Sequence, residues 1–113
     1  MSEYGICFNE WLFDERIRDE LALLIYISLL SAKNGYCDTP NEYFANSFKI
    51  SEATISRQIS KLEKLNFILV TYEKLGSVIT KRNIKLIFDN ETQLEIWKNY
   101  KKQIINAEQK DKQ

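Results

Sequence analysis

The chain has 113 residues, enough to bury one hydrophobic core but too few for two domains. Hydrophobic residues make up 44% of it and charged residues 28%, and no apolar run reaches the roughly 18 residues that a membrane span requires. Two cysteines and no histidine argue against a zinc site and against Ser-His or Cys-His catalysis. We therefore expect a non-enzymatic protein without metal or cofactor. The start of the chain lacks the basic residues of a secretory signal, which predicts a cytoplasmic location without membrane contact.

The net charge is zero, but the charges are unevenly distributed. Residues 1–30 carry six acids and two bases, a balance of −4, whereas residues 31–88 carry nine bases and five acids, a balance of +4. Residues 89–113 carry five of each. A positive segment of this kind is typical of a surface that binds phosphates, although charges spread over solvated faces would give the same count. Because the excess is modest, we expect a homodimer or repeated binding sites.

The first part of the chain predicts a short strand followed by a buried helix. Residues 4–8 are apolar and β-prone, and we expect them to add a strand to the edge of a small sheet. Residues 17–33 are apolar on nearly every side, which is typical of a central helix. Gly35 is placed to end that helix in the left-handed conformation.

Residues 39–67 predict two helices joined by a tight turn. Thr39 is the expected N-cap of the first helix, with Pro40 at its first position and Glu42 closing a capping box. Ser51 is the expected N-cap of a second helix over residues 51–65. Its apolar positions, Ile55, Ile59, Leu62 and Leu65, follow a 3.6-residue period. The opposite face carries short or cationic side chains, as a helix that enters a major groove requires: Ala53, Ser56, Arg57, Ser60, Lys61 and Lys64.

The remaining residues predict a hairpin and a last helix. Asn66 is expected in the left-handed conformation, before strands over 67–73 and 82–88 that a basic loop over 74–81 connects. The last helix begins near residue 89 and repeats four apolar residues on one side. This side either packs on its own domain or buries against a symmetric partner, and we favour dimerisation. The four residues are Leu94, Trp97, Tyr100 and Ile104.

The order helix, helix-turn-helix, hairpin resembles the winged helix-turn-helix fold over about residues 4–88. Phe44-Ala45, Ile50-Ser51 and 54–57 resemble that family's inward alanine, turn and recognition helix. The chain also resembles short winged-helix domains of phage and plasmid replication proteins of Gram-positive bacteria, in which a Gly-Tyr-Cys-like turn precedes the helix pair; here it is residues 35–37. The resemblance implies an α+β winged-helix domain over residues 1–88, followed by a C-terminal helix and polar tail over 89–113.

The resemblance also implies which residues contact double-stranded DNA. The recognition helix would contribute Ser51, Ala53, Thr54, Ser56, Arg57, Ser60, Lys61 and Lys64, and the wing would contribute Lys74, Ser77, Lys81 and Arg82. Arg57 is the expected reader of guanine, unless it pairs with Glu52 or Glu63. Ser51 caps its helix whether or not it also contacts a phosphate, and Thr54 contacts either DNA or solvent. The lysines would also be common on an exposed face that binds nothing.

Two residues depart from the family pattern. Lys49 holds the turn position where the family often has glycine, and Arg57 is the only guanidinium on the recognition helix. Direct base readout is therefore expected to be thin, with DNA shape and phosphates important. The expected function is DNA binding in transcription regulation, replication, partition or conjugative transfer on a plasmid or phage, with a protein partner from such a complex. The alternative is a winged helix that binds protein instead of DNA.

Overall fold

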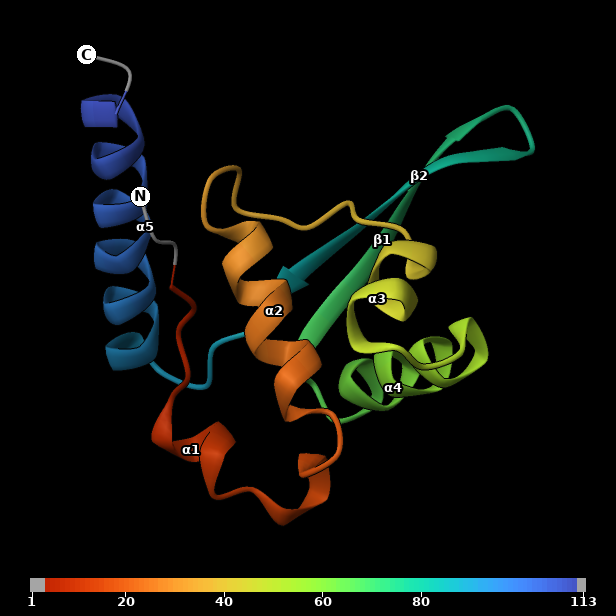
Figure 1. Ribbon diagram of the computed structural model, residues 1–113, viewed down its shortest axis with the longest axis horizontal. Coiled ribbons are helices and arrows are strands. Elements are labelled where there is room, and N and C mark those ends of the chain that lie inside the picture. The colour runs from red at the N-terminus through yellow and green to blue at the C-terminus, as the bar shows by residue number, and fades with distance from the viewer. Residues whose placement is uncertain (1–3, 112–113) are drawn as a thin grey trace.

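The computed structural model describes the backbone of residues 4–111 and the side chains of residues 4–107. The elements follow the order α1 (Asn9–Leu12), the 3-10 helix η1 (Glu15–Ile17), α2 (Leu21–Ser31), α3 (Asn41–Phe48), α4 (Glu52–Lys64), β1 (Ile68–Leu75), β2 (Val78–Leu86) and α5 (Glu91–Asp111). Helices α2, α3 and α4 stand together, and the β1–β2 hairpin projects beyond them (Figure 1). This is the expected α+β winged helix-turn-helix architecture. No helix within residues 4–111 is long and apolar enough to cross a membrane.

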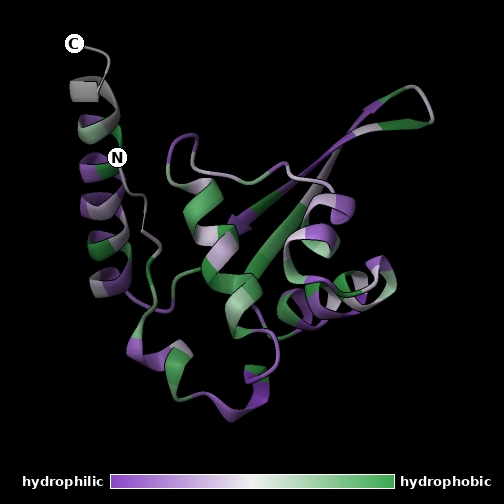
Figure 2. Cartoon of the chain, viewed as in Figure 1, coloured by the Kyte–Doolittle hydropathy of each residue, from purple (hydrophilic) through white to green (hydrophobic). Residues whose placement is uncertain are grey.

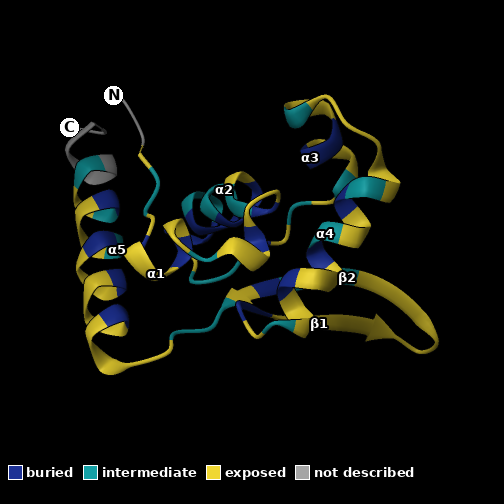
Figure 3. Ribbon diagram, turned by 90° about the horizontal axis from the view of Figure 1, so that it is seen from below, coloured by how far each residue is buried: buried dark blue, intermediate teal, exposed yellow. Residues whose placement is uncertain are grey.

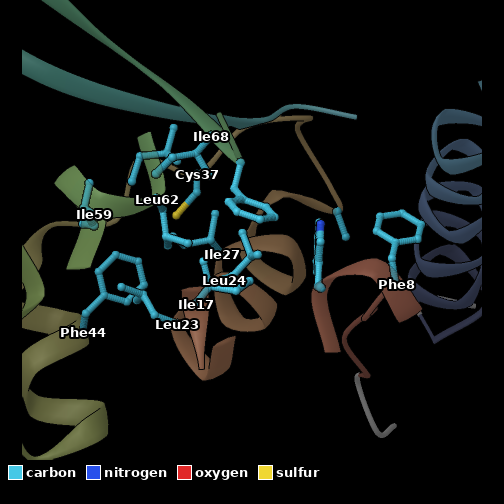
Figure 4. Packing of buried hydrophobic residues seen from close by; sticks show 14 of the residues in the cluster. Phe8, Ile17, Leu23, Leu24, Ile27, Cys37, Phe44, Ile59, Leu62 and Ile68 are labelled. Carbon is cyan, nitrogen blue, oxygen red and sulfur yellow. The ribbon is translucent and has the colours of Figure 1, made fainter. Parts of the chain in front are cut away.

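Helix α2 lies at the centre of the hydrophobic core. Its residues Leu24 and Ile27 are fully buried, and they face Leu62 of α4 and Ile68 of β1 (Figure 4). Apolar residues of α2 thus meet both the helix pair and the sheet, which is why the sequence pattern of α2 has no polar side. The expected central helix is confirmed, although it is shorter than residues 17–33 and begins after η1.

The ends of α3 and α4 agree with the sequence predictions, with one correction. Ser51 caps α4, because its hydroxyl oxygen accepts a hydrogen bond from the N–H of Thr54 at 3.1 Å. Asn66 is left-handed, with φ of 66°, as expected. The expected cap at Thr39 is wrong: α3 begins one residue later, with Pro40 at the N-cap and no side-chain cap. Proline fixes φ and leaves the following N–H groups of the helix to other acceptors or to water.

Lys49 adopts the left-handed conformation, with φ of 57°, at the end of α3. A side chain with a Cβ is disfavoured there by about 1 kcal/mol, a cost that glycine avoids. We therefore expect Lys49→Gly to raise the free energy of unfolding by up to about 1 kcal/mol, measured by denaturant titration. Ser60→Gly is the matched control, because Ser60 is exposed in the interior of α4, where glycine costs helical stability. A loss of stability in Lys49→Gly would contradict the argument.

The hairpin is longer and tighter than expected. Strands β1 and β2 continue to Leu75 and Val78, which pair directly, so only Gly76 and Ser77 form the turn. Gly76 has φ of 64°, as a two-residue turn with glycine first requires. The loop predicted over residues 74–81 is therefore wrong, since strands need only alternating side chains and a tight turn to extend into solvent.

The expected N-terminal strand is also wrong. Residues 4–8 form no strand and run between α2 and α5 (Figures 1 and 3). Their carbonyls accept side-chain hydrogen bonds instead: Tyr100 donates to the carbonyl of Tyr4, and Ser28 donates to that of Ile6. The sheet edge beside β2 is taken by Cys37, whose N–H and C=O each bond Ile84 at 2.8 Å.

Helix α5 packs back on its own chain. Trp97 is 5% exposed, and its ring lies 5.8 Å from that of Phe88 and 5.5 Å from that of Tyr100. Tyr100 and Ile104 are buried as well, and only Leu94 remains exposed. The expectation that these residues bury against a partner is therefore wrong for Trp97, Tyr100 and Ile104, because the N-terminal segment and residue 88 already cover them. The predicted polar tail, residues 108–113, lies outside the described side chains.

Candidate nucleic-acid interface

Helix α4 presents one continuous exposed face. Burial of Ile55, Ile59 and Leu62 turns the opposite side of the helix outward (Figures 3 and 4). The structure places the predicted side chains of this face together and exposed, namely Ala53, Ser56, Arg57, Ser60 and Lys64. Spacings of three and four residues align them along the helix. Short side chains in such a row allow the helix backbone to approach another surface closely.

A chain of hydroxyl contacts orients Arg57 on this face. The hydroxyls of Ser51 and Thr54 lie 2.9 Å apart, and Nη2 of Arg57 donates to the Thr54 hydroxyl at 3.1 Å. Glu63 instead accepts from the N–H of Val70 at 3.3 Å. Arg57 is therefore held towards the start of α4 by a neutral hydroxyl. Its exposed guanidinium can still bind an anionic or polar ligand.

Lys61, on the same helix, is engaged in an ion pair within the protein. Its Nζ lies 2.8 Å from Oε1 of Glu20, whose side chain is only 6% exposed. A carboxylate in that position needs a cation, so Lys61 is tied to the body of the protein. Glu20 also lines, with Asp19 and Arg57, a pocket of about 230 Å³ beside α4. Sequence spacing cannot show this pairing, since the two residues are 41 positions apart.

The structure divides the four predicted wing residues into two pairs. Lys74 and Ser77 are exposed near the tip of the hairpin. Lys81 bonds the hydroxyl of Tyr36 and lies 3.4 Å from the carboxylate of Asp38, and its hydrogen bond to Tyr36 raises its pKa. Lys81 and Arg82 therefore contact residues between α2 and α3, and Lys74 and Ser77 are the exposed pair.

Arg82 joins the wing to the start of α3. Its guanidinium donates to the carbonyl of Thr39 at 2.7 Å and to Oδ1 of Asn41 at 2.6 Å. Burial lowers the pKa of this guanidinium, although an arginine remains charged near neutral pH. Both bonds tie Arg82 to the start of α3, and its contact with DNA stays a prediction. Its position beside an exposed loop in the sequence gave no sign of this structural role.

A comparison with family models agrees with this geometry. A family model described as a helix-turn-helix domain matches residues 17–68, which run from η1 to the first residue of β1. Among solved structures, the chain is similar to a possible transcriptional regulator from Methanosarcina mazei Go1. The identity is 15% and the TM-score 0.49, over 97% of this chain and 92% of that one. No curated protein matches. Residues 17–68 are thus similar to helix-turn-helix domains, and in the structure the β1–β2 hairpin completes a winged helix around α2, α3 and α4.

Proposed function

We propose that this protein binds double-stranded DNA with α4 in the major groove. The observation that carries the proposal is the exposed row of small side chains on α4 with Arg57 and Lys64 beside it, inside a helix-turn-helix domain. A helix of this kind fits a major groove, where a guanidinium can bond O6 and N7 of guanine. Ser51 and Thr54 lie at the start of the same helix, where backbone phosphates are commonly bound.

The hairpin supplies a second, smaller part of the proposed interface. Lys74 and Ser77 are exposed near its tip and would contact the adjacent groove or the sugar-phosphate backbone. Lys81 and Arg82 would act mainly by fixing the angle of the hairpin, since both are bonded within the protein. Sequence-specific contacts are therefore concentrated on α4, and the hairpin contributes contacts that depend little on base sequence.

The proposed setting is a plasmid or phage, in transcription regulation, replication, partition or conjugative transfer. It is supported by the resemblance of the N-terminal half to phage and plasmid winged-helix domains. A homodimer on repeated half-sites is part of the proposal, because two copies double the phosphate contacts of a protein with zero net charge. The alternative is a protein-binding winged helix. It is favoured by the ion pairs of Lys61 and Lys81 within the chain, which reduce the free positive charge.

Titration against labelled DNA from the neighbourhood of its own gene tests the proposal, at two salt concentrations and with nonspecific competitor. We expect salt-sensitive binding that survives competitor. Arg57→Ala should raise Kd for the preferred site by at least about tenfold. It should also reduce the ratio between the Kd for other DNA sequences and the Kd for the preferred site. Arg18→Ala is the matched control, because Arg18 is an exposed arginine that lies outside α4 and the hairpin in the sequence and pairs with Glu15. Absence of binding at low salt, or equal effects of the two variants, would contradict DNA binding through α4.

A further inference from the structure

Strand β1 forms an uncovered edge of the sheet. The order of the sheet is β1–β2, with Cys37 on the far side of β2, and within residues 4–111 no strand lies beside β1. The edge is eight residues long and unusually apolar, since Leu69, Tyr72 and Leu75 are 48%, 54% and 78% exposed. Figure 2 shows hydrophobic residues on both strands near the tip of the hairpin, next to a hydrophilic stretch of β1. Long apolar edges of this kind pair readily with another strand.

The hydrogen-bonding direction of β1 can be derived from its neighbours. Ile84 uses both its backbone groups for Cys37, so Val70, which lies opposite Ile84 in the ladder, cannot bond it. The N–H of Val70 instead points outward, where Oε2 of Glu63 accepts it at 3.3 Å. Because backbone direction alternates along a strand, the N–H and C=O groups of Tyr72 and Lys74 also point to the open edge.

We propose that the open edge binds a second copy of this chain, through antiparallel pairing of the two β1 strands with Tyr72 on the two-fold axis. This register joins the outward-pointing groups of Val70 and Lys74 in opposite copies, and the N–H of Val70 exchanges its bond to Glu63 for one to the carbonyl of Lys74. It also places Leu69 of one copy opposite Leu75 of the other. A shift by two residues in the pairing would instead place Leu69 opposite Glu73. The register with Tyr72 at the centre therefore covers the apolar side chains that a single copy leaves in water.

Charge complementarity supports the same occupant and register. Lys74 of one copy would lie opposite Val70 of the other, beside the carboxylate of Glu63 that occupies this edge in the single chain. The two-fold axis repeats this pair. A DNA phosphate is a poorer occupant, because β1 carries one acid, Glu73, and one base, Lys74, and so has no net positive charge. The inference rests on the homodimer of the proposed function but not on DNA, since pairing of the edges requires no nucleic acid.

Disulfide trapping tests the register. Residues on the two-fold axis of such a pair have Cα atoms about 5.5 Å apart, within the range of a disulfide. In a Cys7→Ser background, which removes the other exposed thiol, Tyr72→Cys should form a covalent dimer on mild oxidation. Thr71→Cys is the matched control and should not, because it would lie opposite Glu73. Trapping through Thr71→Cys, or through neither variant, would overturn the proposed pairing.

Sedimentation without DNA tests the surface itself. We expect the full-length chain to form a dimer, and Lys74→Glu and Glu63→Lys each to raise its dissociation constant by at least about tenfold. The double reversal should restore it, which loss of folding cannot explain. Leu75→Lys should also weaken the dimer, whereas Leu12→Lys, at an exposed leucine outside the edge, should not. A monomer at all concentrations, or a double variant as weak as the single ones, would overturn the proposal. DNA binding by a monomer would separate this failure from that of the proposed function.

Discussion

Trp97→Ala should lower the free energy of unfolding by about 3–5 kcal/mol, the range observed when a buried aromatic side chain is removed. Trp97 is 5% exposed and contacts the rings of Phe88 and Tyr100. Tyr100 in turn holds the N-terminal segment through the carbonyl of Tyr4. Truncation at Trp97 therefore leaves a cavity between α5 and the end of β2, and denaturant titration of the purified variant measures the loss.

The neighbouring residue provides the control. Ile96 is 44% exposed, so Ile96→Ala should cost much less. Both variants should be compared with the parent at low and high protein concentration, because a residue that stabilises only a dimer has an effect that changes with concentration. If Trp97→Ala has the small effect of Ile96→Ala, or acts only at high concentration, the helix does not pack on its own chain in solution.

Local sequence signals were sufficient for the helix-turn-helix domain. The spacing of Ile55, Ile59 and Leu62 identified the buried side of α4, and Ser51 was recognised as its N-cap. Both signals depend only on neighbours within one or two helical turns. The left-handed Asn66 was predicted from the end of the long helix, whereas for Lys49 the only sign was the glycine that the resembled family often has at that position. Because helical periodicity is local, the exposed face of α4 could be predicted before the structure.

Contacts between distant segments could not be predicted in this way. Lys61 and Arg82 read as free cations on exposed elements, but each has a partner that is about 40 residues away in the sequence. The strand expected near Tyr4 is also absent, since Cys37 takes the edge of β2 and the N-terminal segment bonds the side chains of Ser28 and Tyr100 instead. Apolar composition alone also could not tell whether Trp97 faces its own chain or another one, since burial is equally favourable in both.

Arg82→Ala should have the second large effect on the free energy of unfolding. It also distinguishes a structural role of Arg82 from a role in DNA binding. Loss of two bonds from a charged group, at 2.6 and 2.7 Å, should lower the free energy of unfolding by about 2–4 kcal/mol. Arg82→Lys should recover only part of it, because a lysine cannot reach Thr39 and Asn41 with the geometry of a guanidinium. Denaturant titration of the two variants measures both effects.

Lys74→Ala is the control for a base at the hairpin that is exposed in the single chain, and it is compared with the parent at a protein concentration at which both have the same oligomeric state. Lys74 is exposed, so its removal should leave the free energy of unfolding nearly unchanged. It should weaken DNA binding to all sequences by a similar factor and flatten the dependence of log K on log salt, as loss of a phosphate contact does. If Arg82→Ala instead keeps full stability and loses DNA binding, its guanidinium contacts the nucleic acid. The bonds to α3 would then have to open when DNA binds.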